Sequence, residues 1–481
     1  MRSVSGRPER DTGSRMTRIA WFTPLPSSPP GLPCHRTALL AKLQERYAID
    51  RFIGTAPGDL KNPPPRTFSA YDFVWKQLRN PYDLTVYDLA DSPRYDFVWP
   101  YVVRYPGLVI LHDERLHRER ARMLLAQGRD AAYHAEFHYS HPEADPDIPE
   151  LGIAGLLGES VELWPMRRVV IESSRLLVAP NSWVAETFKT EASHDRIEVI
   201  EPGAPDVVTL PGTRERLRSQ HGIAADTVVF ALFGPLTRRR RIDQIWSAVS
   251  LLRHEVPPLH LLVCGETDED QRNATRRHDI TGQVTWIDGA EAATVSAALS
   301  AADVCVCLEW SSGFHAMRSL VESLAAARPA IVTDLADRVD IPCLDPRDWR
   351  VRPLANAHGE LGDLPAEAAC VSVDILDEHH SLPLAMSRLA CDPALRATLG
   401  HGAHTLWQRR FTFDRLVRDF ETHITRALDV SPSEIRQTSL PIHLRSDGTE
   451  GVGSRLAPFG VRLPGLSDLA PAASPEVPSK P

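Results

Sequence analysis

Short apolar runs alternate with longer stretches of helical periodicity along most of the chain. The runs are rich in Val, Ile and Leu and lack polar alternation, which predicts strands buried on both faces of a parallel sheet. The stretches between them repeat apolar residues at helical spacing, which predicts helices that cover those faces. The expected fold class is therefore α/β. The strands predicted in the first half are 18–25, 48–54, 83–89, 107–113, 176–182 and 197–203.

A second series of the same kind follows in the second half of the chain. Its predicted strands are 227–234, 259–265, 284–288, 303–309 and 330–334. Two such series predict two doubly wound Rossmann-like domains that face each other across a cleft. The stretch 201–213 between them is rich in proline and glycine, as linkers are. We therefore expect an N-terminal domain at 16–205, a C-terminal domain at 206–411, and a helix at 412–428 that crosses back to the first domain.

The two ends of the chain differ from the rest. Residues 1–15 are charged and lack the apolar core of a secretory signal, so they are expected to form a disordered extension, with Met16 as an alternative start. Residues 429–481 are rich in proline and glycine, which predicts a disordered tail. No stretch approaches the ~18 consecutive apolar residues of a spanning helix. A soluble protein is expected, with peripheral membrane contact left open.

Composition narrows the function classes. An apolar fraction of 43% with 24% charged residues is typical of a globular protein, and the net charge of -9 argues against a surface built for nucleic acid. The seven cysteines form no CxxC pair, and Cys305 and Cys307 alternate with valines as packing residues of a strand. A reducing, cytoplasmic setting is the expectation. The acidic pair in 145–147 lies in a proline-rich loop, and no metal site is predicted.

The stretch "FGPLTRRRRIDQIW" places Arg238–Arg241 between a predicted strand and an amphipathic helix. Thr237 is expected to cap that helix, which would put the four arginines in its first turn. Cations at a helix N-terminus oppose the macrodipole by ~0.3–1 kcal/mol each. A bound anion would remove this penalty, and helix amides with guanidinium groups suit a diphosphate. The alternatives are a solvated charge run or a nucleic-acid patch, although no aromatic residues are interleaved as the latter requires.

The segment from this stretch to "LHLLVCGE" resembles the donor-site segment of retaining GT-B glycosyltransferases of family 4 (glycosyl transferases group 1), which use nucleotide-activated sugars. In that family a strand-end glycine is followed by an arginine and then by a second basic residue, and both cations hold the donor diphosphate. Gly234 matches the glycine and Arg240 the second cation, whereas Pro235 stands at the first. Arg238 and Arg241 are the candidates to supply the missing charge.

Two stretches of the first half extend this resemblance. "RIAWFTPLPSSPPGLPCHRTALLAKL" is similar to the family's opening strand, glycine loop and first helix, which implies that Gly31 approaches the donor phosphate. "YPGLVILHDERLHRER" matches a strand-end histidine that faces the transferred sugar. The resemblance thus assigns a catalytic role to His112, and Asp113 would fix its tautomer or its loop. The alternatives are a proline-rich loop without a ligand and a structural histidine.

The family's signature of two glutamates separated by seven residues corresponds to "LEWSSGFHAMRSLVESLAAARPAIVTD" (308–334). Counted back from Pro329, Glu322 takes the place of the second glutamate, which binds the nucleotide ribose. Counted forward from Gly313, that place falls on Arg318, about one helical turn earlier. Arg318 and Glu322 could instead be a surface pair at i, i+4 spacing.

The first glutamate of the signature is assigned to Glu309, at a predicted strand end. It would contact the donor sugar and act in catalysis, with twelve residues rather than seven before Glu322. Ser312 and Gly313, which follow with Ser311, would offer hydroxyls and amides to phosphate at the next helix start.

The resemblance implies a glycosyltransferase that moves a sugar from a nucleoside diphosphate sugar to an acceptor bound by the first domain, with retention. The nucleotide sugar is a co-substrate, and no metal or other cofactor is required. The acceptor is a carbohydrate, a glycolipid or a small molecule, and not a nucleic acid. A GT-B-like binding or partner protein without transfer activity is the alternative, because Pro235, the stretched glutamate signature and Ala327 in place of a glycine depart from the family. An RNA-binding protein is the third possibility.

Overall fold

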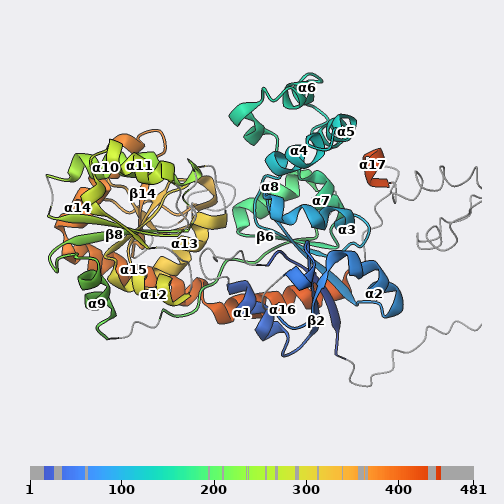
Figure 1. Cartoon of the computed structure of the whole chain (residues 1–481), viewed down its shortest axis with the longest axis horizontal. Helices are drawn as coiled ribbons and strands as arrows, with labels where there is room; N and C mark the ends of the chain where they lie inside the picture. The colour runs from blue at the N-terminus through green and yellow to red at the C-terminus, as the bar shows by residue number, and fades with distance from the viewer. Residues whose placement is uncertain are drawn as a thin grey trace, which may run out of the picture. The chain divides into compact units, whose positions relative to one another are not determined.

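The structure is a computed structural model of the whole chain, shown in Figure 1. It describes residues 16–25, 35–59, 63–192, 195–207, 211–234, 236, 238–254, 257–265, 269–287, 292–310, 314–338, 340–355, 362, 367–431 and 440–445. Gly31, Ser312, Gly313, Pro235 and Thr237 lie outside these residues.

The first half of the chain forms a parallel sheet of seven strands. Every strand pair in it is parallel, as the unbroken apolar runs predicted. The strand order turns back between β1 and β4, which is where an open α/β sheet opens a crevice at its carboxyl edge. In sheet order the strands are β3 (Thr67–Ser69), β2 (Ala48–Ile53), β1 (Arg18–Phe22), β4 (Leu84–Leu89), β5 (Leu108–Leu111), β6 (Leu176–Ala179) and β7 (Ile197–Val199).

Helices cover both faces of this first sheet. On one face Ile19 and Trp21 of β1 share a core with Leu39 of α1 (His35–Leu43) and with Phe420 and Ile424 of α16 (Phe413–Asp429). The helix near the end of the described chain therefore belongs to the first domain's core. The other face carries an aromatic cluster around Phe22. The remaining helices of this domain are α2 (Phe73–Arg79), α3 (Trp99–Val102), α7 (Arg168–Ser173) and α8 (Ser182–Glu191).

The second half forms another parallel sheet of seven strands with the same kind of order. Its strand order turns back between β8 and β11. All of its pairs are parallel. In sheet order the strands are β10 (Val284–Ile287), β9 (Leu259–Cys264), β8 (Val228–Phe233), β11 (Val304–Cys307), β12 (Ala330–Thr333), β14 (Cys370–Val373) and β13 (Cys343–Leu344).

The two faces of the second sheet carry separate helix layers, which Figure 1 shows on either side of β8. Alternate residues of β8 supply the two cores: Phe230 and Leu232 face one layer, and Ala231 and Phe233 the other. The first layer contains α10 (Ile242–Leu252), α11 (Glu269–Arg277) and α14 (Glu378–Cys391). The second contains α9 (Thr213–Gln220), α12 (Ala292–Ala301), α13 (Phe314–Ala325) and α15 (Pro393–Arg410).

A separate unit of small helices is inserted in the chain between β5 and β6. It comprises residues 117–169 and, from the later part of the chain, residues 440–445. Its core is built around Leu124, Tyr133 and Phe137. Its helices are α4 (His117–Leu125), α5 (Asp130–Ser140), α6 (Ile148–Ile153) and α17 (Ile442–Arg445).

The predicted α/β fold with two doubly wound sheets is confirmed, and three local predictions are corrected. Arg238–Arg240 form a separate turn of 3-10 helix, and α10 starts only at Ile242, because Arg241 adopts a left-handed φ of 53° and interrupts the helix. Apolar residues recur at helical spacing over 158–174, before the predicted strand at 176–182, which predicts one helix there. The structure has two, Gly158–Leu163 and α7, since Pro165 lacks an N–H and Met166 has a φ of 48°. Strands β3, β13 and β14 were not predicted, and α17 lies within the stretch predicted as a disordered tail.

Candidate active site

The candidate site of the second domain lies at the carboxyl edge of its sheet, where the strand order turns back between β8 and β11. Gly234 follows β8 directly and has a φ of 93°, which suits glycine alone. Its backbone is packed tightly, because an added Cβ on Gly265, after β9, would lie 2.4 Å from the Gly234 oxygen. The edge thus brings backbone close together at the ends of two neighbouring strands.

Arg240 turns its side chain inward from the 3-10 turn after β8. It is 3% exposed, and its Nη2 donates to the carbonyl oxygen of Phe233 at 3.1 Å. Its Nη1 is buried and has no hydrogen-bond partner among the residues that the structure describes. Burial lowers the pKa of Arg240, Cys307 and Glu309 act in the opposite direction, and Arg338 lowers it again. A buried guanidinium with an unused donor is ready to bind an anion.

Glu309 follows β11 and is held at both its backbone and its side chain. Its N–H donates to Thr333 Oγ1 at 2.9 Å, and the N–H of Trp310 donates to the Arg239 oxygen at 2.7 Å. The Glu309 carboxylate is 3.4 Å from Nη2 of Arg338, which the sequence analysis had not singled out. Nε and Nη1 of Arg338 are buried without a partner among the described residues. A carboxylate and two arginines therefore meet at this edge.

Glu322 lies on α13, where it is buried rather than on the surface. Its Oε1 is 3.5 Å from Arg318 Nε and 3.0 Å from His35 Nε2, the first residue of α1. The other oxygen, Oε2, is buried without a partner among the described residues. The i, i+4 pair with Arg318 thus exists, but as a buried one. Whether Glu322 binds a ribose remains a prediction.

Of the two arginines predicted to supply the missing charge, Arg241 can be compared with Arg240. Arg241 Nη2 lies 2.6 Å from Glu378 Oε2, so a carboxylate at the start of α14 occupies its guanidinium. The side chain of Arg238 lies outside what the structure describes. The structure therefore brings Arg240, and not Arg241, to Glu309.

In the first domain, His112 follows β5 and meets Asp88, which lies near the end of β4. His112 Nε2 is 2.9 Å from Asp88 Oδ1, and Trp21 Nε1 donates to Asp88 Oδ2 at 2.9 Å. Arg36 Nη2 lies 2.7 Å from the same His112 nitrogen and 3.3 Å from Asp88 Oδ1. One Nε2 cannot both donate to Asp88 and accept from Arg36. The carboxylate is the stronger partner, so we assign the Nε2 proton to the His112–Asp88 bond.

The charges in this group favour an ionised carboxylate beside a neutral imidazole. Burial raises the pKa of Asp88, but Arg36 and His112 outweigh burial and bring that pKa to about 2. For His112, burial is the largest influence and lowers the pKa, against the opposing effect of Asp88. With the proton on Nε2, Nδ1 of a neutral His112 can accept a hydrogen bond from a sugar hydroxyl.

Asp113 does not contact the His112 ring in the described contacts. Its Oδ2 accepts the Asp91 N–H at 3.0 Å and so ties together the loops after β4 and β5. Of the two roles predicted for Asp113, this contact matches the loop, whereas the carboxylate on the His112 ring belongs to Asp88. A cavity of about 110 Å³ opens beside this group, with Arg36, Asp88 and His112 in its wall.

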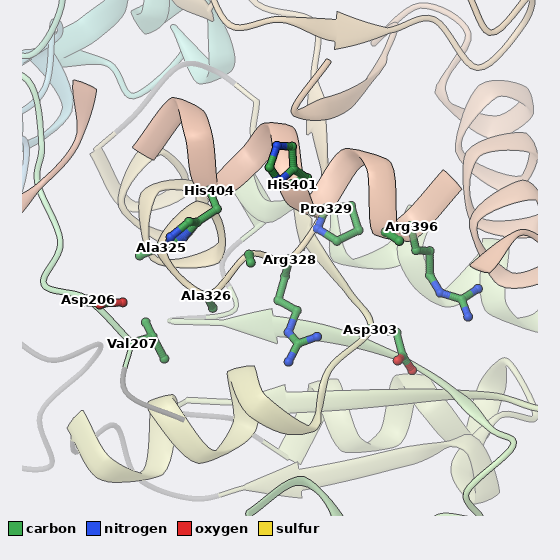
Figure 2. Close-up of a pocket in the computed structure, with 13 residues that line it drawn as sticks. Asp206, Val207, Asp303, Ala325, Ala326, Arg328, Pro329, Arg396, His401 and His404 are labelled. Carbon is green, nitrogen blue, oxygen red and sulfur yellow. The ribbon is translucent and has the colours of Figure 1, made fainter. Parts of the chain in front are cut away.

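A larger cavity, of about 500 Å³, lies at the opposite edge of the second sheet, next to the residues that precede β11 and β12. Figure 2 shows His401 and His404 of α15 on one side and Arg328 on the other. Small residues make up much of the rest of its wall. Chemistry at an α/β sheet is expected at the carboxyl edge, so size alone does not make this cavity the active site.

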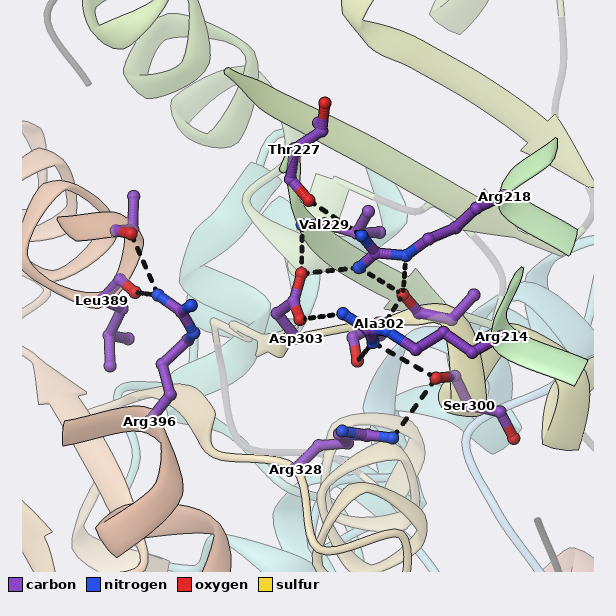
Figure 3. Close-up of polar contacts among 12 residues, drawn as sticks. Arg214, Arg218, Thr227, Val229, Ser300, Ala302, Asp303, Arg328, Leu389 and Arg396 are labelled. Carbon is purple, nitrogen blue, oxygen red and sulfur yellow. Dashed lines mark hydrogen bonds and ion pairs between the residues drawn. The ribbon is translucent and has the colours of Figure 1, made fainter. Parts of the chain in front are cut away.

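The polar groups around this larger cavity are bonded to one another, as Figure 3 shows. Asp303 accepts from Arg214 at 2.5 Å, from Arg218 at 2.7 Å and from the Val229 N–H at 2.7 Å. Arg218 also donates to the Ala301 and Thr227 oxygens. Together with Arg328, which donates to the Leu299 and Ser300 oxygens, these arginines cap the carboxyl end of α12. This cluster stabilises the domain.

Two searches of the described residues complete the picture. None of their helices is long and apolar enough to cross a membrane. They also contain no group of three His, Cys, Asp or Glu side chains placed to hold a metal ion.

Comparison with known proteins gives a family match for part of the second domain. Residues 213–339, which hold Gly234, Arg240, Glu309, Glu322 and Arg338, match the family model described as "Glycosyl transferases group 1". The two parallel seven-stranded sheets match the GT-B fold of solved glycosyltransferases. The fold of the chain is similar to that of sucrose-phosphate synthase from Thermosynechococcus elongatus, with a TM-score of 0.61, 14% identity, and coverage of 86% of this chain and 100% of the other. The Anabaena protein HepE, solved with UDP and glucose, gives a TM-score of 0.57 and 13% identity over 85% of this chain and 100% of HepE. At these identities the two structures show the fold alone.

A curated relative supports the same family. The D-inositol 3-phosphate glycosyltransferase of Pseudarthrobacter chlorophenolicus is 26% identical over 247 residues, which cover 49% of this chain and 52% of the relative. The match thus spans about half the length of that relative.

The structure adds functional candidates that the sequence analysis missed. Asp88 lies near the end of β4, where it is buried, and the sequence analysis gave it no role. Its only signal in the sequence is that an acidic residue stands within a predicted buried strand. Arg36 and Arg338 had no signal at all, because their partners lie far away in sequence.

Proposed function

We propose that this GT-B protein transfers a sugar from a nucleoside diphosphate sugar to an acceptor, with retention of anomeric configuration. The observation that carries the proposal is the buried cation Arg240, which has an unused donor beside Glu309 at the turning point of the second sheet. Donors already in place would meet the negative charge that develops on the leaving diphosphate. Glu309 and His112 would contact the sugar, and Glu322 the ribose.

The donor class is also supported by what a fold relative binds. HepE was solved with UDP and glucose, and with UDP-glucose. We propose a nucleoside diphosphate sugar here and leave the base and the sugar to experiment. The acceptor would be a carbohydrate, a glycolipid or a small molecule bound by the first domain. The described cysteines are free thiols, which supports our proposal of a cytoplasmic, reducing setting.

The test begins with thermal shifts of the purified protein with UDP, GDP and ADP and with their glucose and mannose conjugates. A nucleotide that stabilises the protein is followed by assays of sugar transfer and donor hydrolysis, and proton NMR of the first product reports the anomer. We expect stabilisation by one nucleoside diphosphate, turnover of its sugar conjugate, and activity that survives EDTA. No stabilisation by any donor would overturn the proposal, and binding without turnover would indicate the inactive binding protein instead.

A further inference from the structure

The first of the two cations that the family uses to hold a diphosphate is missing from its expected place in the sequence, where Pro235 stands. Arg241 does not replace it, since its guanidinium is paired with Glu378. Among the described residues at this edge, a further buried arginine is present. Arg338 lies in the 3-10 turn Ala336–Arg338 after β12 and is 4% exposed.

Three neighbouring strands bring the relevant side chains together. In the sheet, β11 lies between β8 and β12, so the loops after the three strands share one edge. Arg240 follows β8, Glu309 follows β11, and Arg338 follows β12. The Thr333 hydroxyl accepts a hydrogen bond from the Glu309 N–H at 2.9 Å, which links the loop after β11 to β12. The Trp310 N–H donates to the Arg239 oxygen at 2.7 Å, which links the loop after β11 to the segment after β8.

Hydrogen bonding within the protein does not satisfy the two guanidinium groups. Nη1 of Arg240 and both Nε and Nη1 of Arg338 are buried without a partner among the described residues. Asp337 does not fill the gap, because its own Oδ1 is buried and unpartnered as well. Of the three guanidinium nitrogens of Arg338, Nη2 is the one that donates to the Glu309 carboxylate, at 3.4 Å. Buried charged donors that lack partners are costly, and an anion of two or more oxygens would satisfy them.

We propose that Arg338 supplies the missing cation of the diphosphate site: it acts beside Arg240 and replaces the arginine that the family places where Pro235 stands here. The inference rests on the proposed function and specifies which group of the donor these residues bind. Two guanidinium groups flanking Glu309 would hold the diphosphate, while Glu309 faces the sugar attached to it. The site would then be complete, although the family's usual pair of cations is not present in sequence.

The test is isothermal titration of Arg338→Met and Arg338→Lys with UDP, GDP and ADP, and with the matching nucleosides. If UDP binds the wild-type protein, Arg338→Met should weaken UDP binding roughly 10- to 100-fold and leave uridine binding unchanged, because only the diphosphate is contacted. Arg338→Lys keeps the charge and should lose less. Arg347→Met is the matched control, since Arg347 is an exposed arginine of the same domain whose partners are Asp345 and Asp374.

A rescue variant keeps the proposal testable if Arg338→Met folds poorly. Pro235→Arg in the Arg338→Lys background should recover part of the lost UDP affinity. The inference is overturned if folded Arg338→Met binds UDP within about threefold of the wild-type protein, or if uridine and UDP weaken in parallel. Failure of the wild-type protein to bind any of the three diphosphates would instead overturn the proposed function.

Discussion

The two edges of the second sheet hold arginines that are equally buried and differently bonded. Arg218, at the amino edge, is 4% exposed, and Arg240, at the carboxyl edge, is 3% exposed. Arg218 donates to Asp303 and to two carbonyl oxygens, whereas Arg240 donates to one carbonyl oxygen and keeps a buried Nη1 without a partner in the described part of the chain. Burial alone therefore does not distinguish a structural arginine from a ligand-binding one.

The difference follows from the direction of parallel strands. Helices that run back from the carboxyl edge end at the amino edge, where their last carbonyl groups need donors. Arg214, Arg218 and Arg328 satisfy those at the end of α12. At the carboxyl edge the next helices begin, and that edge offers donors rather than acceptors. Arg240 and Arg338 keep buried nitrogens there without a partner among the described residues, and an external anion would satisfy them.

The largest expected effect is on stability at the amino edge. Arg218→Met removes one partner of a buried ion pair, and we expect a loss of about 3 kcal/mol in the free energy of unfolding, because Arg214 still holds Asp303. Urea denaturation measures the loss, and UDP affinity should not change. Arg347→Met, the exposed control, should unfold like the wild-type protein. If Arg218→Met is as stable as the wild-type protein but binds UDP poorly, Arg218 is a ligand-binding arginine rather than a structural one, contrary to this account.

At the carboxyl edge the effect should fall on binding instead. Arg240→Met is expected to weaken UDP binding by about 1.5–3 kcal/mol, since a charge-assisted hydrogen bond is lost. The unfolding free energy without nucleotide should stay the same or rise, because a poorly paired buried charge is replaced by an apolar side chain. Calorimetry and urea denaturation on the same samples separate the two quantities. Destabilisation as large as that of Arg218→Met would show that Arg240 is structural too.

The first sheet offers an intermediate case, a carboxylate paired at a carboxyl edge. The pKa of Asp88 is about 2 in the folded protein and close to 3.8 when unfolded, so its ionised form adds about 2 kcal/mol of stability at neutral pH. Because the folded pKa is the lower one, this stability is present above pH ~4 and is lost as the pH falls toward 2. Asp88→Asn should be less stable than the wild-type protein at pH 7, and the gap should close in acid. A gap that stays constant in urea denaturation at pH 7, 4 and 3 would contradict this account.

The smallest effect concerns a strained residue at the larger cavity. Ala327 has a φ of 55°, where an alanine costs ~1–2 kcal/mol more than a glycine, partly offset by the entropy of glycine in the unfolded chain. Ala327→Gly should therefore gain up to about 1 kcal/mol in unfolding free energy, with unchanged UDP affinity. Ala326→Gly, at the preceding position without a positive φ, should lose stability. If Ala327→Gly and Ala326→Gly change the stability equally in thermal denaturation, the backbone at Ala327 is not strained.

Prediction from the sequence succeeded where the signal is local. Apolar periodicity located two series of parallel strands. The family resemblance assigned Gly234 and Arg240 to donor binding, and that role stays a prediction. Prediction from the sequence failed at the 3-10 turn of Arg238–Arg240, because the left-handed backbone of Arg241 has no signature in a run of identical residues. It also treated Arg241 as equivalent to Arg240, since only the packing of α14 reveals Glu378 as its partner.

The sequence by itself determined the class of this protein: alternating apolar runs and helical stretches can be buried together only as two doubly wound sheets. Because all strands of a parallel sheet end at the same edge, the residues that follow the strands of each sheet are expected at its carboxyl edge. Only the tertiary structure decided which charges are already paired. Asp88 meets Arg36 and His112 across separate loops, and Arg338 meets Glu309 across two neighbouring strands. Pairing depends on distances between segments remote in sequence, and no periodicity along the chain encodes those distances.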